Sequence, residues 1–370
     1  MDIRIEKSFL TQGLYLAQGI ADRRAAIPIL GNVLLRAEKG KLFIAATDLG
    51  MLVFAELPCD VQQEGGLTIS AKQFYEIIKN LPNGQVQLSV TEENYLQVST
   101  GKIRYKMVGL PVGDYPKLPT IEQVNFGNVE TLALKELIGK TIFSVSVDEN
   151  RPNLSGAFLE SLPVEKPTLR MVSTDGHRLS RCTKEIGEKI TIKPGIIIPR
   201  KALVEIRRFL ETSSEKIGMG IYQGHLFLKD KSTVFGCKLN EATFPPYEQV
   251  IPKESTRVAM VSSGLLLDAL KRITLVAPDK TAGVKLYFVT GLLRIEANNP
   301  ELGQGVEEIE IDYKGKELAI GFNSKYLIEI ISEIGAGDVR FELNGELDPG
   351  MIRPNNESNQ YVGVVMPMRI

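Results

Sequence analysis

One ten-residue pattern recurs three times in this chain and constrains its fold more than any other feature. The copies occupy residues 72–81, 201–210 and 325–334. Each copy has lysine first, two apolar residues at the third and fourth positions, Glu-Ile at the fifth and sixth, and an apolar residue at the tenth. The copies lie about a third of the chain apart, which predicts three similar domains in tandem and excludes a short-repeat solenoid.

Each copy of the pattern has the apolar spacing of an amphipathic helix. Its lysine and glutamate are four residues apart, so we expect them to meet on one helix face. Ser70, Pro199 and Asn323 are suited to begin the three helices. Apolar strands are predicted before the helices and alternating strands after them, at 67–69 and 86–90, 196–198 and 217–221, and 318–320 and 339–343.

Every repeat also contains an earlier helix followed by two strands. The helices are predicted at 9–20, 132–143 and 265–276. The strands are predicted at 33–36 and 41–46, 156–160 and 169–173, and 283–289 and 292–297. We therefore predict an α+β fold of three tandem similar domains, each with antiparallel sheets and two helices. The expected domain boundaries are 1–124, 125–254 and 255–370.

Composition and charge exclude several classes of protein. The 370 residues contain no apolar run long enough to span a membrane, and the N-terminus does not have the pattern of a signal peptide. Cys59, Cys182 and Cys237 are too far apart for a zinc site or a disulfide framework, which favours a reducing cytoplasm. The net charge of −1 argues against tight DNA binding through overall charge but allows a basic face.

The first and last repeats are as regular as the middle one, whereas open arrays usually end in atypical polar units. Their outer strands would leave unpaired edges, which proteins generally cover or pair. Head-to-tail pairing with a second copy would close a ring.

Six short segments carry a resemblance to a known family. They are residues 27–32, 173–179, 199–201, 297–300, 321–323 and 365–369. Together they resemble the bacterial DNA polymerase III beta subunit, the replicative sliding clamp, over essentially the whole chain. The resemblance implies the DNA clamp fold and a head-to-tail homodimer that encircles duplex DNA. It implies a non-catalytic processivity factor without a cofactor. The implied partners are the DNA polymerase III alpha subunit, the clamp loader complex, and other DNA polymerases and repair proteins that carry clamp-binding peptides.

Basic side chains are the candidates for contact with DNA. Several match channel-facing positions of the clamp family, and others lie on the repeated helices or near the end of the first domain. The candidates are Arg24, Lys72, Lys102, Arg104, Arg151, Arg200, Lys201 and Arg208. Each could instead be an ordinary solvated surface charge. Asp148 and Glu149 precede Arg151, which argues against close DNA contact by that loop.

The resemblance also implies a peptide-docking pocket between the second and third domains. Its residues, by position, are Leu154, Thr174, Gly176, His177, Arg178, Leu179, Pro245, Val250, Val364, Val365, Met366, Pro367 and Met368. Adaptable methionine side chains suit a site with many partners. Pro246, Glu248 and Gln249 make its rim less basic than is common in the family. The resemblance places the dimer interface at Tyr105 and Met107 of one chain and Leu275 and Val276 of the other.

Two alternatives remain open from the sequence. A hydrolase could be centred on Asp175 and His177, but Asp-Gly between apolar strands is a hairpin-turn signal. Neither a nucleophile-elbow sequence, a glycine-rich phosphate loop nor metal-ligand spacing is present in the sequence. The second alternative is a β-rich scaffold protein that never encircles DNA.

Overall fold

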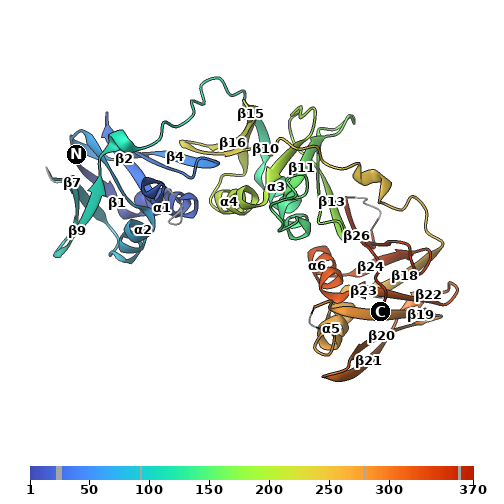
Figure 1. Cartoon of the computed structure of the whole chain (residues 1–370). Helices are drawn as coiled ribbons and strands as arrows, with labels where there is room; N and C mark the ends of the chain where they lie inside the picture. Colours follow the sequence, from blue (N-terminus) through green and yellow to red (C-terminus); the bar gives the residue numbers. More distant parts are fainter. Residues whose placement is uncertain (22–26, 92–93, 279, 357–359) are drawn as a thin grey trace. The chain divides into compact units, whose positions relative to one another are not determined.

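The computed structural model describes residues 1–21, 27–91, 94–278, 280–356 and 360–370 (Figure 1). The chain forms two compact units. The first unit is Met1–Thr131 with Lys201–Leu239, and the second unit is Leu132–Arg200 with Asn240–Ile370. The middle repeat therefore contributes to both units. The three domain boundaries expected from the sequence stay a prediction.

Among the described residues, thirteen antiparallel strands form one sheet in the first unit. Strands β17 and β4 pair from Thr233↔Ala55 to Cys237↔Met51, so the sheet runs without a break from the first repeat into the middle one. In order the strands are β10 (Gly127–Glu130), β15 (Lys216–Tyr222), β16 (His225–Asp230), β17 (Thr233–Lys238), β4 (Met51–Pro58), β3 (Lys41–Thr47), β2 (Asn32–Glu38), β6 (Gly65–Ser70), β9 (Ile103–Leu110), β8 (Tyr95–Thr100), β7 (Gln85–Val90), β1 (Asp2–Glu6) and β5 (Asp60–Gln63).

The helices of the first unit cover this sheet with their apolar stripes. They are α1 (Lys7–Ile20), α2 (Ala71–Asn80) and α4 (Arg200–Glu211), apart from Arg200 itself, with the short 3-10 turns η1 (Pro28–Gly31) and η2 (Val112–Asp114). Helix α1 packs against α2 and against β3 and β4. Phe74 and Ile78 of α2 are fully buried four residues apart, as the helical period requires.

The second unit contains two antiparallel sheets among its described residues. The larger sheet has the order β14 (Ile196–Pro199), β11 (Gly156–Ser161), β12 (Thr168–Thr174), β13 (Arg178–Glu185), β26 (Tyr361–Val365), β25 (Gly350–Pro354), β24 (Asp338–Leu343), β18 (Arg257–Ser262) and β22 (Asp312–Tyr313). The smaller sheet has the order β21 (Gly303–Glu310), β20 (Leu292–Asn299), β19 (Gly283–Val289) and β23 (Leu318–Asn323). The β13–β26 pair joins the middle repeat to the last one.

Helices α3 (Thr131–Gly139), α5 (Ser263–Thr274) and α6 (Ser324–Ile334) belong to the second unit apart from Thr131 itself. Helix α5 packs against α6 and against β20 and β21. The 3-10 turns η3 (Ile142–Ser144) and η4 (Tyr247–Gln249) complete the unit.

The repeated pattern forms α2, α4 and α6, so all three helices expected from it are confirmed. The earlier helices are confirmed as α1, α3 and α5, and the strand expected at 283–289 coincides with β19. Helix α3 ends at Gly139, four residues before the expected end. Glycine is a poor helix former, and the Thr141 hydroxyl donates to the Leu137 carbonyl at 2.7 Å where the helix stops.

Asn323 is the N-cap of α6, as expected. Its side-chain oxygen accepts hydrogen bonds from the backbone N–H groups of Lys325 (2.9 Å) and Tyr326 (3.3 Å). Ser70 occupies the corresponding position before α2, but its side chain makes no capping bond. Only one of these two predicted caps therefore contributes side-chain stabilisation.

We expect Asn323→Ala to lower the free energy of unfolding by about 1 kcal/mol, because two helix N–H groups lose their acceptor. Urea unfolding followed by circular dichroism would measure the change. Ser70→Ala is the matched control, and its effect should be close to zero. Equal effects of the two substitutions would contradict the assignment of Asn323 as the stabilising cap.

Candidate functional site

An apolar cluster covers one face of the larger sheet of the second unit. Strand register places Leu179 opposite both Thr174 and Val364. Residues opposed in antiparallel strands project to the same face. The cluster, called here the sheet cluster, comprises the buried residues Val172, Leu179, Ile197, Phe244, Tyr247, Met351, Val362 and Val364, with Phe158, Ala242 and Ile251 packed against them.

The segment around η4 lies over this cluster and is fastened by aromatic and polar contacts. The Phe244 ring stacks on Phe158 with centroids 5.0 Å apart. The Tyr247 hydroxyl donates to Glu160 (2.5 Å) and accepts from Arg170 Nη1 (3.1 Å). Burial and the bond to Glu160 raise the pKa of Tyr247 to about 12, so the hydroxyl keeps its proton at neutral pH.

The turn at residues 174–178 is a structural hairpin beside the cluster. Asp175 Oδ1 accepts from the backbone N–H groups of His177 (2.9 Å) and Arg178 (3.1 Å). Gly176 has φ +95°, which a side chain would strain. The Met366 N–H donates to the His177 carbonyl at 2.8 Å. These bonds bring the end of β26 against the turn and leave the His177 residue exposed.

Arg178 is a buried cation with partners on several elements. It donates to Asp175 Oδ2 (3.0 Å), to the Phe143 carbonyl (2.7 Å) and to Glu329. Its guanidinium also lies 4.3 Å from the centroid of the Tyr326 ring. Arg178 therefore ties β13 to η3 and to α6, and Glu329, the glutamate of the third repeated helix, is one of its anchors.

The structure brings together only part of the pocket predicted from the sequence. Thr174, Leu179 and Val364 share the face of the sheet that carries the cluster. Val250 and Met366 are exposed; Val250 directly precedes Ile251 of the cluster, and Met366 directly follows β26. Arg178 and Val365 oppose each other and project to the opposite face of the sheet, away from the cluster. The remaining predicted positions are Leu154, which is buried, the exposed Gly176 and His177, and the half-buried Pro245, Pro367 and Met368.

Sequence reasoning missed several members of the sheet cluster. Phe158, Val172 and Val362 lie on strands, and their alternation could have indicated a shared face. Phe244 and Tyr247 lie in an irregular segment with two prolines, where no periodicity applies.

The basic residues predicted to contact DNA fall in different settings. Arg24 lies outside the described residues. Lys72 is exposed on α2, and Lys201 is exposed on α4, where its Nζ lies 2.7 Å from Asp48. Arg208 pairs with the buried Glu205 at 2.9 Å. Burial raises the pKa of the Glu205 carboxyl, and Arg208 acts in the opposite direction.

Arg200 and Arg151, also predicted to contact DNA, differ in their hydrogen bonding. Arg200 Nη1 is buried and has no hydrogen-bond partner among the described residues. Arg151 Nη1 donates to the Asp175 carbonyl at 3.1 Å, so this predicted DNA contact also supports the hairpin turn. Arg207, which the sequence reasoning passed over, is exposed on α4 with Lys201 and adds to its basic surface.

The repeated lysine–glutamate spacing does not make the same ion pair in each helix. Glu205 pairs with Arg208, Lys201 with Asp48, and Glu329 with Arg178. The glutamates of α4 and α6 therefore bind arginines, and in α6 the arginine belongs to another element.

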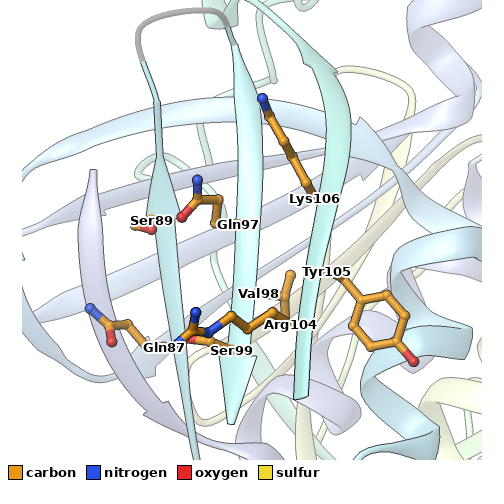
Figure 2. Close-up of a pocket in the computed structure, with 8 residues that line it drawn as sticks. All are labelled: Gln87, Ser89, Gln97, Val98, Ser99, Arg104, Tyr105 and Lys106. Atoms are coloured by element: carbon orange, nitrogen blue, oxygen red, sulfur yellow. The ribbon is translucent and has the colours of Figure 1, made fainter. Parts of the chain in front are cut away.

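Strand β9 presents an open edge in the first unit. Residues 103–108 pair with β8 on one side, whereas on the other side, among the described residues, only Gly109 and Leu110 pair, with β6. Figure 2 shows Arg104 reaching toward β8 and Tyr105 projecting on the opposite side of β9. A polar hollow of about 480 Å³ follows this sheet region, lined by Gln87, Ser89, Gln97, Val98, Ser99, Arg104, Tyr105 and Lys106.

Strand β21 is an edge strand of the second unit. The end of α5 lies over it: a side chain on Gly305 would meet Val276 Cγ2 at 2.7 Å. Arg272 Nε donates to Glu307 Oε2 at 3.0 Å. Leu275, just past the last turn of α5, is 78% exposed and has the accessible surface that an interface residue needs.

Family models match almost the whole chain. The N-terminal, central and C-terminal domains of the DNA polymerase III beta subunit match residues 1–119, 128–246 and 248–369. The chain belongs to this family. The beta sliding clamps of Caulobacter vibrioides and Pseudomonas aeruginosa are 32% and 33% identical to it, each over 100% of both chains.

Solved clamp structures have the same fold. A Caulobacter crescentus beta sliding clamp with bound polyethylene glycol matches with a TM-score of 0.94 and 31% identity, over 100% of this chain and 99% of that one. A Pseudomonas aeruginosa sliding clamp bound to griselimycin matches with a TM-score of 0.93 and 31% identity, over 100% of both chains. The expected clamp fold is confirmed.

Membership of this family makes the chain a DNA sliding clamp, a non-catalytic processivity factor of DNA polymerase III. The hydrolase alternative is not supported, because Asp175 already serves the turn and Arg178. Among the described residues, no cluster of His, Cys, Asp and Glu is arranged to hold a metal ion. The described helices include none with the length and apolarity to cross a membrane.

Proposed function

We propose that two copies of the chain join head to tail, β9 of one protomer beside β21 of its partner, and close a ring around duplex DNA. The observation that carries this proposal is the pair of open strand edges with opposite charge. Lys102, Arg104 and Lys106 lie on or beside β9, whereas Glu307, Glu308 and Glu310 lie on β21. Open edges invite strand addition, and opposite charges favour one partner and one register.

The apolar residues of the two edges would meet in the same arrangement. Tyr105 and Met107 oppose the buried residues Val98 and Leu96, so they share the face of the sheet that packs inward. On β21, Gly305 lies beneath Val276 at the end of α5. Addition of β21 to β9 would therefore bring Tyr105 and Met107 beside Leu275 and Val276.

The residues proposed to face DNA are Arg24, Lys72, Arg151, Arg200, Lys201, Arg207 and Arg208. Of those that the structure describes, all but Arg151 lie on helices α2 and α4. Lys102 and Arg104, predicted from the sequence to contact DNA, lie where pairing with the β21 glutamates is favoured instead. A ring is retained by topology, so loose and sequence-independent phosphate contacts suffice.

The sheet cluster and the exposed residues beside it form the proposed docking pocket for partner peptides. The proposed partners are the DNA polymerase III alpha subunit, the clamp loader, and other DNA polymerases and repair proteins. A short anchored peptide would bind with a Kd of about 1 μM, roughly −8 kcal/mol, which permits exchange between partners. We place this activity in the cytoplasm, and loading requires an ATP-driven clamp loader acting in trans.

Retention on circular DNA tests the ring directly. After loading by a bacterial clamp loader with ATP, the protein should remain on a nicked circular plasmid through gel filtration and leave when the plasmid is linearised. Topological retention predicts this difference, because a linear duplex offers free ends. Equal retention on circular and linear DNA would instead support a scaffold that binds DNA without encircling it.

A further inference from the structure

Arg181 occupies an unusual place within the docking surface. On β13 it stands opposite Val172 of β12 and Val362 of β26, and both valines belong to the sheet cluster. Opposed residues of antiparallel strands project to the same face, so the Arg181 side chain rises from the apolar face itself. The Arg181 residue is half-buried, and arginine is seldom withdrawn from solvent without a partner of opposite charge.

The cationic group of Arg181 is left with unused hydrogen-bonding capacity. Its Nε is buried and has no hydrogen-bond partner in the part of the chain that the structure describes. Burial lowers the pKa of Arg181, and the neighbouring Arg170 lowers it further, yet an arginine stays charged at neutral pH. A buried donor without an acceptor is costly, so an incoming acceptor gains more here than at the surface.

Arg353 and Arg170, whose charges both act on Arg181, already have carboxylate partners of their own. Arg353 Nε donates to Glu342 Oε1 at 2.9 Å. Arg170 Nη1 contacts Glu248 Oε1 at 3.2 Å. The Glu248 side chain is 72% exposed, and its charge partly opposes the lowering of the Arg181 pKa, so a negative charge on this side favours the guanidinium.

We propose that Arg181 binds a carboxylate of the docked peptide, so that the pocket prefers apolar peptides that carry an acidic group. This inference rests on the docking function proposed above. A guanidinium donates two parallel hydrogen bonds to a carboxylate, which gives orientation as well as attraction. The rim at residues 246–249 has fewer positive charges than is common in the family, and Arg181 of β13 would supply a positive charge from the sheet instead.

A peptide series with matched charges tests the proposal. The parent is acetyl-Ala-Leu-Ala-Leu-Phe-Ala-amide, and each alanine in turn is replaced by aspartate or by its neutral isostere asparagine. A further peptide has a free C-terminal carboxylate in place of the amide, which separates a chain-end acid from a side-chain acid. Binding to the full chain is measured by isothermal titration calorimetry at 50 mM and 300 mM salt as chosen conditions, roughly 13 Å and 6 Å in Debye length.

At least one acidic peptide should bind about 10-fold more tightly than its neutral twin, equivalent to about 1.4 kcal/mol. In Arg181→Gln, and in Arg181→Met as a second variant of similar length, the twins should bind equally. Lys166→Gln removes an exposed cation of the same unit, paired with Glu185, and should keep the preference.

The outcomes separate the two proposals. Equal binding of every twin by the unaltered chain, or a preference that survives both Arg181 substitutions, overturns the role of Arg181 and leaves the docking pocket standing. Failure of all the peptides to bind overturns the docking of apolar peptides and this inference with it.

Discussion

Replacing both Leu275 and Val276 by alanine should leave a folded protein that no longer dimerises at nanomolar concentration. Leu275 is 78% exposed in the single chain, so its truncation removes little of the chain's own packing. In the proposed ring the same side chain is buried against Tyr105 and Met107 of the partner. Loss of two central apolar anchors typically costs about 4 kcal/mol of binding, or roughly a 1,000-fold weaker dimer.

Analytical ultracentrifugation over nanomolar to micromolar concentration would measure the dissociation constant. Leu265→Ala is the control, because it truncates another exposed leucine at the opposite end of α5. Its dimer should dissociate like that of the unaltered protein. A double-alanine variant that remained dimeric at nanomolar concentration would remove Leu275 and Val276 from the interface.

Arg178→Ala should lower the free energy of unfolding by about 3 kcal/mol. The substitution removes a buried cation and leaves the carboxylates of Asp175 and Glu329 and the Phe143 carbonyl without their donor. The side chains of Asp175 and Glu329 are 16% and 45% exposed, so water compensates Glu329 better than Asp175. The hairpin turn beside the docking pocket should loosen, and peptide binding should weaken with it.

Thermal unfolding followed by circular dichroism measures the effect, with an expected decrease in Tm of roughly 6 °C. Arg340→Ala is the matched control, since Glu342 keeps Arg353 as a partner when Arg340 is removed. Its Tm should change by no more than about 1 °C. Equal Tm values for the two variants would show that Arg178 does not hold these elements together.

The helices were predictable from the sequence because each one is defined by local spacing. In α2, α4 and α6 the apolar positions of the repeated pattern fall on the buried stripe, as at Phe74, Leu203 and Leu327. The joining of the repeats was not predictable in the same way. The β17–β4 and β13–β26 pairs depend on register between strands far apart in the chain, which local alternation does not encode.

The candidate site was predictable only where a motif marked it. The turn at Asp175 and Gly176 carries a local signal, and both residues take part in the hairpin beside the sheet cluster. Arg181 carries none, because a single arginine in an alternating strand is normally solvent-facing. It is half-buried between Val172 and Val362, and only the assembled sheet brings these three residues together.

The unbroken ladders between β17 and β4, and between β13 and β26, bear on any attempt to dissect the chain. A fragment cut out along the repeat boundaries would lose a neighbouring strand on at least one margin. The unpaired backbone N–H and C=O groups of that strand edge would be exposed to solvent beside apolar side chains such as Val53 and Val364. Isolated repeats should therefore self-associate through their exposed strand edges, and the whole chain is the smallest unit expected to fold without aggregating.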